Sequence, residues 1–149
     1  MGRQAVAVVF AALLLAGCEI GGGEDTGREQ FVQDADAVCQ RYSQRISGIP
    51  QPQTFLRDFA VYMRRAVPVA RQQNRELERL PSPEDVEEDF RRMIVLLDQQ
   101  LDLAAQAGEE AYAGREARAQ AAFQQSLAPA SEASRLAARI GFATCGRAA

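Results

Sequence analysis

The chain has 149 residues, enough for one domain, and its 47% hydrophobic and 25% charged residues are typical of a folded protein rather than a disordered one. All 17 basic residues are arginine and there is no histidine, so the commonest general base and metal ligand is missing. A net charge of −3 argues against nucleic acid as a partner, because nucleic-acid binding usually needs a basic domain.

The N-terminus has the features of a bacterial export signal. Arg3 supplies a positive charge, and an apolar run of 13 residues, AVAVVFAALLLAG, follows at residues 5–17. The run is too short to cross a bilayer as a helix, which takes about 20 residues. It has the length of the hydrophobic segment of a signal peptide.

The end of this run, Leu15, Ala16, Gly17 and Cys18, resembles the lipobox of bacterial lipoproteins. The resemblance implies that the signal peptide is cleaved just before Cys18 and that Cys18 carries a thioether-linked diacylglycerol with acyl chains such as palmitate. The protein would then be a lipoprotein on the extracytoplasmic face of the cell membrane. The alternatives are an ordinary signal peptide cut nearby or an uncleaved membrane anchor.

Three segments follow from this interpretation. Residues 1–17 are expected to be the lipoprotein signal peptide, and residues 18–27 the lipidated cysteine with a flexible tether rich in glycine and acids. Such a tether has a root-mean-square reach of roughly 17–19 Å. Residues 28–149 are expected to be the folded domain, held close to the membrane.

From residue 28 onward, apolar residues recur at spacings of three and four, which predicts helices. The first is expected over 28–47, where glycine and prolines follow, and the second from about 54 to 80. Ser82 and Pro83 suit the cap and first position of a third helix. A fourth is expected to end with Gly141 as its cap. Its start is left open, because either Gly108 or Gly114 could mark the break.

No stretch alternates with period two, so no strand is predicted. Four long helices with short connections favour an all-α fold, an antiparallel up-down-up-down four-helix bundle. Pro68 and Pro129 fall inside the second and fourth helices, where each removes a backbone hydrogen bond and favours a kink. The sequence leaves open whether a kink opens a pocket between helices.

The two remaining cysteines are expected to pair. In an up-down-up-down bundle, Cys39 on the first helix and Cys145 after the last helix lie at the same end, and disulfides persist outside the cytoplasm. We therefore predict a Cys39–Cys145 disulfide; the alternative is two separate buried thiols.

Three motifs, DADAVC at 34–39, RLPSPED at 79–85 and RIGFATCG at 139–146, are together similar to secreted and lipid-anchored helical proteins of actinobacteria whose function is uncharacterised. The resemblance covers nearly the whole mature chain. It implies a paired first and last cysteine around a helical bundle, and it implies no activity.

The sequence offers no chemistry for catalysis, and we predict a non-enzymatic protein without a cofactor. A ferritin-like metal site needs histidine, so no metal is expected, and no haem motif is present. Met63 and Met93 fall on apolar helix faces as ordinary core residues. The acidic run at residues 84–89 suits the start of a helix, where the dipole favours negative charge.

Arg57, Arg64 and Arg71 recur every seven residues along the second helix. They are candidates for binding anionic ligands or lipid headgroups. The alternative, which we favour, is that arginines of this helix form ion pairs with the third helix. The expected pairs are Arg79 with Glu84, Arg75 with Glu88 and Arg65 with Asp98.

The function expected from these observations is that of a membrane-anchored extracytoplasmic module that binds an unidentified protein or another component of the cell envelope. The alternative is a small-ligand carrier or sensor with a cavity between kinked helices. A closed core of Phe, Leu and Ala would favour the first, and an enclosed apolar cavity on the scale of several hundred Å³ would favour the second.

Overall fold

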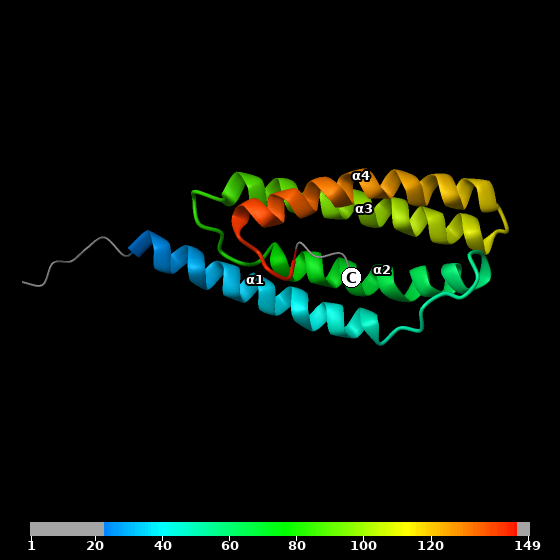
Figure 1. Cartoon of the computed structure of the whole chain (residues 1–149), viewed down its shortest axis with the longest axis horizontal. Coiled ribbons are helices and arrows are strands. Elements are labelled where there is room, and N and C mark those ends of the chain that lie inside the picture. The colour runs from blue at the N-terminus through cyan, green and yellow to red at the C-terminus, as the bar shows by residue number, and fades with distance from the viewer. Residues whose placement is uncertain (1–22, 146–149) are drawn as a thin grey trace, which may run out of the picture.

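The computed structural model describes residues 23–145 and consists of four packed helices. They are α1 (Gly23–Ser47), α2 (Arg57–Leu77), α3 (Glu87–Tyr112) and α4 (Glu116–Ile140). Figure 1 shows α1 and α2 in one layer and α3 and α4 in the other, and α3 contacts α2 between the layers. Residues 23–145 contain no strand, so the prediction of an all-helical bundle is confirmed.

The predicted membrane anchor lies outside the described residues, because the expected signal peptide, the lipobox and Cys18 all precede residue 23. Within the described residues, none of the helices has the combination of length and apolar character that a membrane span requires.

The first helix is longer than expected. It begins at Gly23 rather than at residue 28, so residues 23–27 of the expected tether are helical. The physical reason is that extending an existing helix adds one hydrogen bond per residue fixed, which is far easier than starting a new one.

The connection between α2 and α3 is longer than expected. It covers residues 78–86, because α2 ends at Leu77 and α3 begins at Glu87, four residues after Pro83. A turn at the end of this connection is closed by the Val86 N–H, which donates to the Pro83 carbonyl at 3.2 Å. Leu80 and Val86 both pack into the core. Packing of these two side chains therefore outweighs the local preference of Ser82 and Pro83 for a helix start.

This connection also sets how α2 and α3 are aligned, and the three expected ion pairs of Arg65, Arg75 and Arg79 are not formed in the described chain. Asp98 instead accepts a hydrogen bond from the Asn74 amide at 2.8 Å. Arg71 instead pairs with Asp102 at 2.6 Å. The first turns of α3 extend beyond the end of α2, so each α2 residue faces a later residue of α3 than a tight hairpin would give it.

The break between α3 and α4 lies at Gly114, and the alternative at Gly108 is wrong. Gly114 has a φ of +73°, which favours glycine. Gly108 lies buried within α3 against α2, where an added Cβ would stand 2.7 Å from the Cβ of Met63. Gly108 therefore allows two helices to approach closely and does not end one.

Gly141 ends α4, as the sequence predicts. Its φ is +103°. Its N–H donates to the Ala138 carbonyl at 3.2 Å, and the N–H of Phe142 donates to the Ala137 carbonyl at 2.9 Å. This is the Schellman arrangement, which satisfies the last carbonyls of the helix and turns the chain back toward α1.

Two separate clusters of buried side chains form the core. The main core lies where α1 and α3 begin and where α2 and α4 end. It includes Phe31, Val38, Leu77, Phe90, Met93, Leu136, Ile140 and Phe142. The tip core lies at the opposite end, and its buried members are Phe59, Ala60, Ala107, Ala111, Ala119 and Ala122, all from α2, α3 and α4. One end of the molecule is therefore a four-helix core and the other a three-helix core.

Candidate functional site

The C-terminal segment is fastened to α1 by a carboxylate and a disulfide. The side chain of Asp36 accepts hydrogen bonds from the N–H groups of Ala143 at 2.8 Å, Thr144 at 2.7 Å and Cys145 at 3.1 Å. Cys39 and Cys145 form a disulfide with an S–S distance of 2.08 Å, as the sequence predicts. Asp36 holds the backbone at Cys145, which brings its sulfur to that of Cys39.

The three candidate anion-binding arginines have different environments. Arg71 is neutralised by Asp102. The guanidinium of Arg64 lies over the ring of Tyr112, 5.1 Å from its centroid. Arg57 is exposed and, among the described residues, forms no ion pair. The structure therefore does not bring the three together as one set of free positive charges.

Arg64 and Tyr112 belong to an open groove between α2 and α3, which we call the α2–α3 groove. Its volume is about 410 Å³, and Met63, Val67, Pro68 and Gly108 also line it. Tyr112 is 72% exposed although it is aromatic. The groove is formed by α2 residues 63–68 and by the last two turns of α3. Figure 1 shows that α3 ends at the side of the molecule opposite the start of α1.

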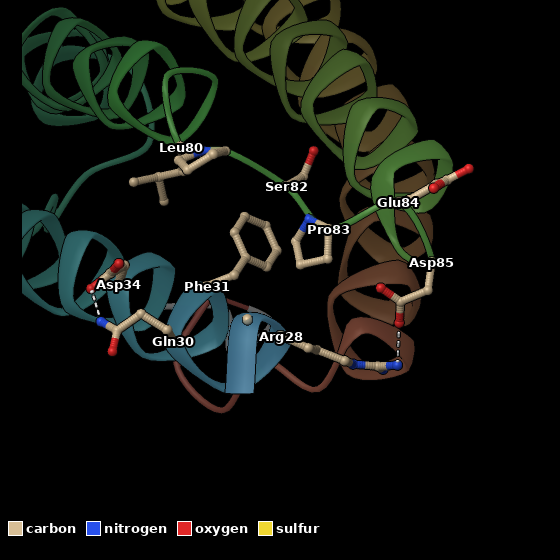
Figure 2. Close-up of a pocket in the computed structure, with 11 residues that line it drawn as sticks. Arg28, Gln30, Phe31, Asp34, Leu80, Ser82, Pro83, Glu84 and Asp85 are labelled. Carbon is tan, nitrogen blue, oxygen red and sulfur yellow. Dashed lines mark hydrogen bonds and ion pairs between the residues drawn. The ribbon is translucent and has the colours of Figure 1, made fainter. Parts of the chain in front are cut away.

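A larger cleft of about 700 Å³ lies between the start of α1 and the connection 78–86. Figure 2 shows Phe31 pointing into it from α1, opposite Leu80 and Pro83, with Arg28 reaching Asp85 at its edge. The Arg28 guanidinium is 2.9 Å from the Asp85 carboxylate, and the Gln30 amide donates to Asp34 at 2.9 Å. These polar groups are already paired with one another, so the cleft offers few free groups to a ligand.

A third space, which we call the central cavity, has a volume of about 330 Å³ and is lined by residues of all four helices and by the Cys39–Cys145 disulfide. Ser43 and Ile46 line it from α1, and Ala130 lines it from α4, next to Pro129. Pro68, the other helical proline, lines the α2–α3 groove. Each of the two helical prolines is therefore at or beside a hollow.

Several acidic side chains form ion pairs with arginines. In the run at residues 84–89, Asp85 pairs with Arg28, Glu87 with Arg91, and Asp89 with Arg139. The hydrogen bond to Asp89 raises the pKa of Arg139 above its ordinary value. In the described part of the chain, no group of three or more acids and cysteines is placed to hold a metal ion.

An ion pair also joins the two ends of the α3–α4 turn. Glu110, near the end of α3, bonds Arg115, which precedes α4. The hydrogen bond from Arg115 lowers the pKa of the Glu110 carboxyl, and the same bond raises the pKa of Arg115. This pair stabilises the turn.

Comparisons with family models, with curated proteins and with solved structures find no match to this chain. The function must therefore be argued from its own residues. The sequence left open whether Pro68 and Pro129 open a pocket, and it gave the position of neither the α2–α3 groove nor the central cavity. Tyr112, an aromatic residue near the end of α3, was the sequence feature that could have indicated the groove. The cavity is lined by polar residues from several helices, and these residues have no common spacing in the sequence.

Proposed function

We propose that the protein is a lipoprotein anchored through Cys18 to the extracytoplasmic face of the cell membrane, and that its domain is a non-enzymatic module that binds another protein of the cell envelope. The anchor is supported by the apolar run at 5–17 and by the lipobox residues at 15–18. Two acyl chains are enough for stable anchoring.

The proposal includes an up-down-up-down order of the four helices. Contacts between helix ends support it. The end of α4 meets the start of α3, because Arg139 pairs with Asp89 at 2.9 Å. The start of α1 meets the end of α4, because Arg28 donates to the Ile140 carbonyl at 3.1 Å.

One observation carries the interaction role, namely the exposed Tyr112 and Arg64 in the α2–α3 groove. Tyrosine and arginine are enriched among the residues that dominate binding energy in protein interfaces, especially beside a pocket that an anchor can fill. A helix of 26 residues is about 39 Å long. The groove is at the end of α3, far from the start of α1, so a domain tethered through the chain before α1 can present it to a partner.

The anchor is tested by membrane fractionation. We expect Cys18→Ala to move the protein from the membrane to the soluble fraction, because no other residue carries the proposed lipid. The double variant Cys39→Ala/Cys145→Ala is the matched control and should stay in the membrane. If the Cys18→Ala protein fractionates like the wild type, the lipid anchor is refuted.

The interaction surface is tested by site-specific photocrosslinking in native membranes. A photoreactive aromatic amino acid at position 112 should give a discrete crosslinked product with one envelope protein. The control carries the same group at Leu127, which is 47% exposed on α4. Equal crosslinking from both positions, or none from position 112, would exclude the groove as the binding surface.

A second function, that of a small-ligand carrier or sensor, is favoured by the central cavity. Its volume of about 330 Å³ is within the range of ligand pockets, which begins at about 300 Å³.

A further inference from the structure

The central cavity lies between the main core and the tip core, beside the second half of α1. Tyr42 is the last residue of α1 in the main core, and α1 contributes no residue to the tip core. Beyond Tyr42, Ser43 and Ile46 face α4 residues such as Ala130 and Ser134 across the cavity. The cavity therefore lies beside the part of α1 that follows its last main-core residue.

Four polar side chains of the lining form no hydrogen bond within the described part of the protein. Among the described residues, no hydrogen bond involves the side chains of Ser43, Gln100, Ser134 or Thr144, although all four are half-buried. The Gln73 amide donates to Sγ of Cys39 at 3.4 Å, and a sulfur is a weak acceptor. Polar groups in such positions gain free energy when a molecule in the cavity accepts or donates their hydrogen bonds.

The remaining lining is apolar. Met93, Leu97 and Leu101 contribute it from α3, and Ala70 and Ala130 from α2 and α4. Apolar area of this kind stabilises a bound ligand by removing its hydrocarbon surface from water. A site that combines an apolar wall with a few polar groups is typical of small-molecule pockets.

Within residues 23–145, no arginine, aspartate or glutamate lines the cavity. Among the described lining residues, Asn74 is the only one whose side chain bonds a charged group, and its amide already binds Asp98 outside the lining at 2.8 Å. The backbone N–H groups of Thr144 and Cys145 are likewise already bonded to Asp36. The cavity is partly open to solvent, so an ionised ligand would lose part of its hydration there without gaining an opposite charge, which is unfavourable. The volume of about 330 Å³ equals that of roughly eleven water molecules, so the ligand must be compact.

We propose that the central cavity is a binding site for a compact, uncharged, amphipathic small molecule. Hydroxyl or carbonyl groups of this molecule bond Ser43, Gln100, Ser134 and Thr144, and its hydrocarbon part packs against Leu97 and Leu101. The site develops the carrier alternative, and it depends neither on the lipid anchor nor on the envelope partner.

The test uses 2-naphthol and 2-naphthoate, which share the same ring system and differ in charge near neutral pH. Equilibrium binding is measured on the full mature protein in lipid nanodiscs, with empty nanodiscs subtracted. We expect saturable binding of 2-naphthol and none of 2-naphthoate. Absence of saturable binding of 2-naphthol, or equal binding of both, would overturn the proposal.

Variants locate the binding. Ala130→Leu places three additional carbon atoms in the cavity and should weaken 2-naphthol binding by roughly tenfold or more, since a single methylene in a pocket changes affinity by about 10–200-fold. Ala128→Leu, the same change at an exposed position of α4, should leave binding unchanged. Equal binding by Ala130→Leu and the wild type would place the ligand elsewhere and refute the site.

A second variant keeps the test valid if Ala130→Leu does not fold. Thr144→Val removes one hydroxyl with little change in shape and leaves the backbone bond to Asp36 in place. It should weaken 2-naphthol binding, and combining it with Ser134→Ala should weaken binding further. Unchanged affinity in the double variant would contradict the polar side of the proposal. None of these outcomes affects the Cys18→Ala fractionation result, so the lipid anchor and the ligand site can be refuted independently of each other.

Discussion

Gly108 and Met63 show how one missing side chain sets the distance between two helices. An alanine at position 108 would improve helix propensity by about 1 kcal/mol. Its Cβ, however, would lie 2.7 Å from the Cβ of Met63, and neither atom can rotate away because each is fixed by its own backbone. We expect Gly108→Ala to lower the free energy of unfolding by about 1–3 kcal/mol, the usual cost of overpacking, measured by urea denaturation.

Gly27 is the matched control for this substitution. It lies in α1, and an added Cβ would have nothing within 4 Å. Gly27→Ala should therefore raise the free energy of unfolding by up to about 1 kcal/mol. If both substitutions stabilise the protein, close packing of α2 and α3 at Gly108 is wrong.

Asp36 provides the second residue-scale prediction. Its carboxylate serves three backbone N–H groups of the C-terminal segment, and hydrogen bonds to a charged group contribute more than neutral ones. Asp36→Ala should lower the free energy of unfolding by about 1.5–3 kcal/mol. Asp34→Ala should change it by less than about 0.5 kcal/mol, because Asp34 is exposed and, within residues 23–145, binds only the Gln30 side chain. Equal losses would show that the C-terminal segment is held by other contacts.

These residue-scale contacts were only partly predictable. Gly141 could be assigned as a cap, because a glycine that follows an apolar helical pattern has one common role. Gly108 has the same local sequence signal as a helix end, and only the position of Met63 on another helix shows its real role. The role of Asp36 could not be predicted from the sequence around it, because the three N–H groups that it binds are about 107 residues away.

At the scale of elements, the α3–α4 turn responds to pH through Glu110. Arg115 lowers the pKa of this carboxyl in the folded state. Its stabilising contribution is therefore fully present above the ordinary value of 4.5 and is lost as the pH falls through the lowered value. Glu110→Gln should be less stable than the wild type near neutral pH, and the difference should vanish well below pH 4.5.

Thermal unfolding of both proteins across this pH range checks the prediction. The control is Glu109→Gln, since Glu109 forms no ion pair within residues 23–145. The control should follow the wild-type pH dependence. A constant difference between Glu110→Gln and the wild type at every pH would mean that the Arg115 pair does not account for the loss.

The positions of the helices could be predicted better than their mutual alignment. Apolar spacing located all four helices, because each buries one face. The alignment of α2 with α3 depends on the connection 78–86, where Leu80 and Val86 pack into the core. Local rules place a helix start at Ser82, and this error is why the ion pairs expected for Arg65, Arg75 and Arg79 are not formed in the described chain.

At the scale of the whole molecule, the disulfide closes a loop across a sequence separation of 106 residues. In the chain-entropy model, closing such a loop stabilises a protein by about 4–5 kcal/mol. The double variant Cys39→Ala/Cys145→Ala should lose about this much in urea denaturation, and chemical reduction of the wild type should have a similar effect. Unfolded, non-reduced protein should expose neither of these thiols; detection of both would contradict the pairing.

The overall architecture followed from the sequence, whereas the hollows between the helices did not. Four amphipathic stretches need one another to bury their apolar faces, which restricts the choice of fold. The central cavity arises because α1 contributes to one core cluster and not the other. That outcome depends on the relative positions of four helices, which no single segment encodes.

The disulfide also determines whether proteolytic cleavage releases a fragment of the protein. Exposed connections are the preferred sites of cleavage, and here the three connections at 48–56, 78–86 and 113–115 all lie between Cys39 and Cys145. A single cut in any of them leaves two fragments that are still covalently joined and still packed together. Such a nicked molecule retains its mass until a reductant is added, and only a second cut within the ring can release a piece of it.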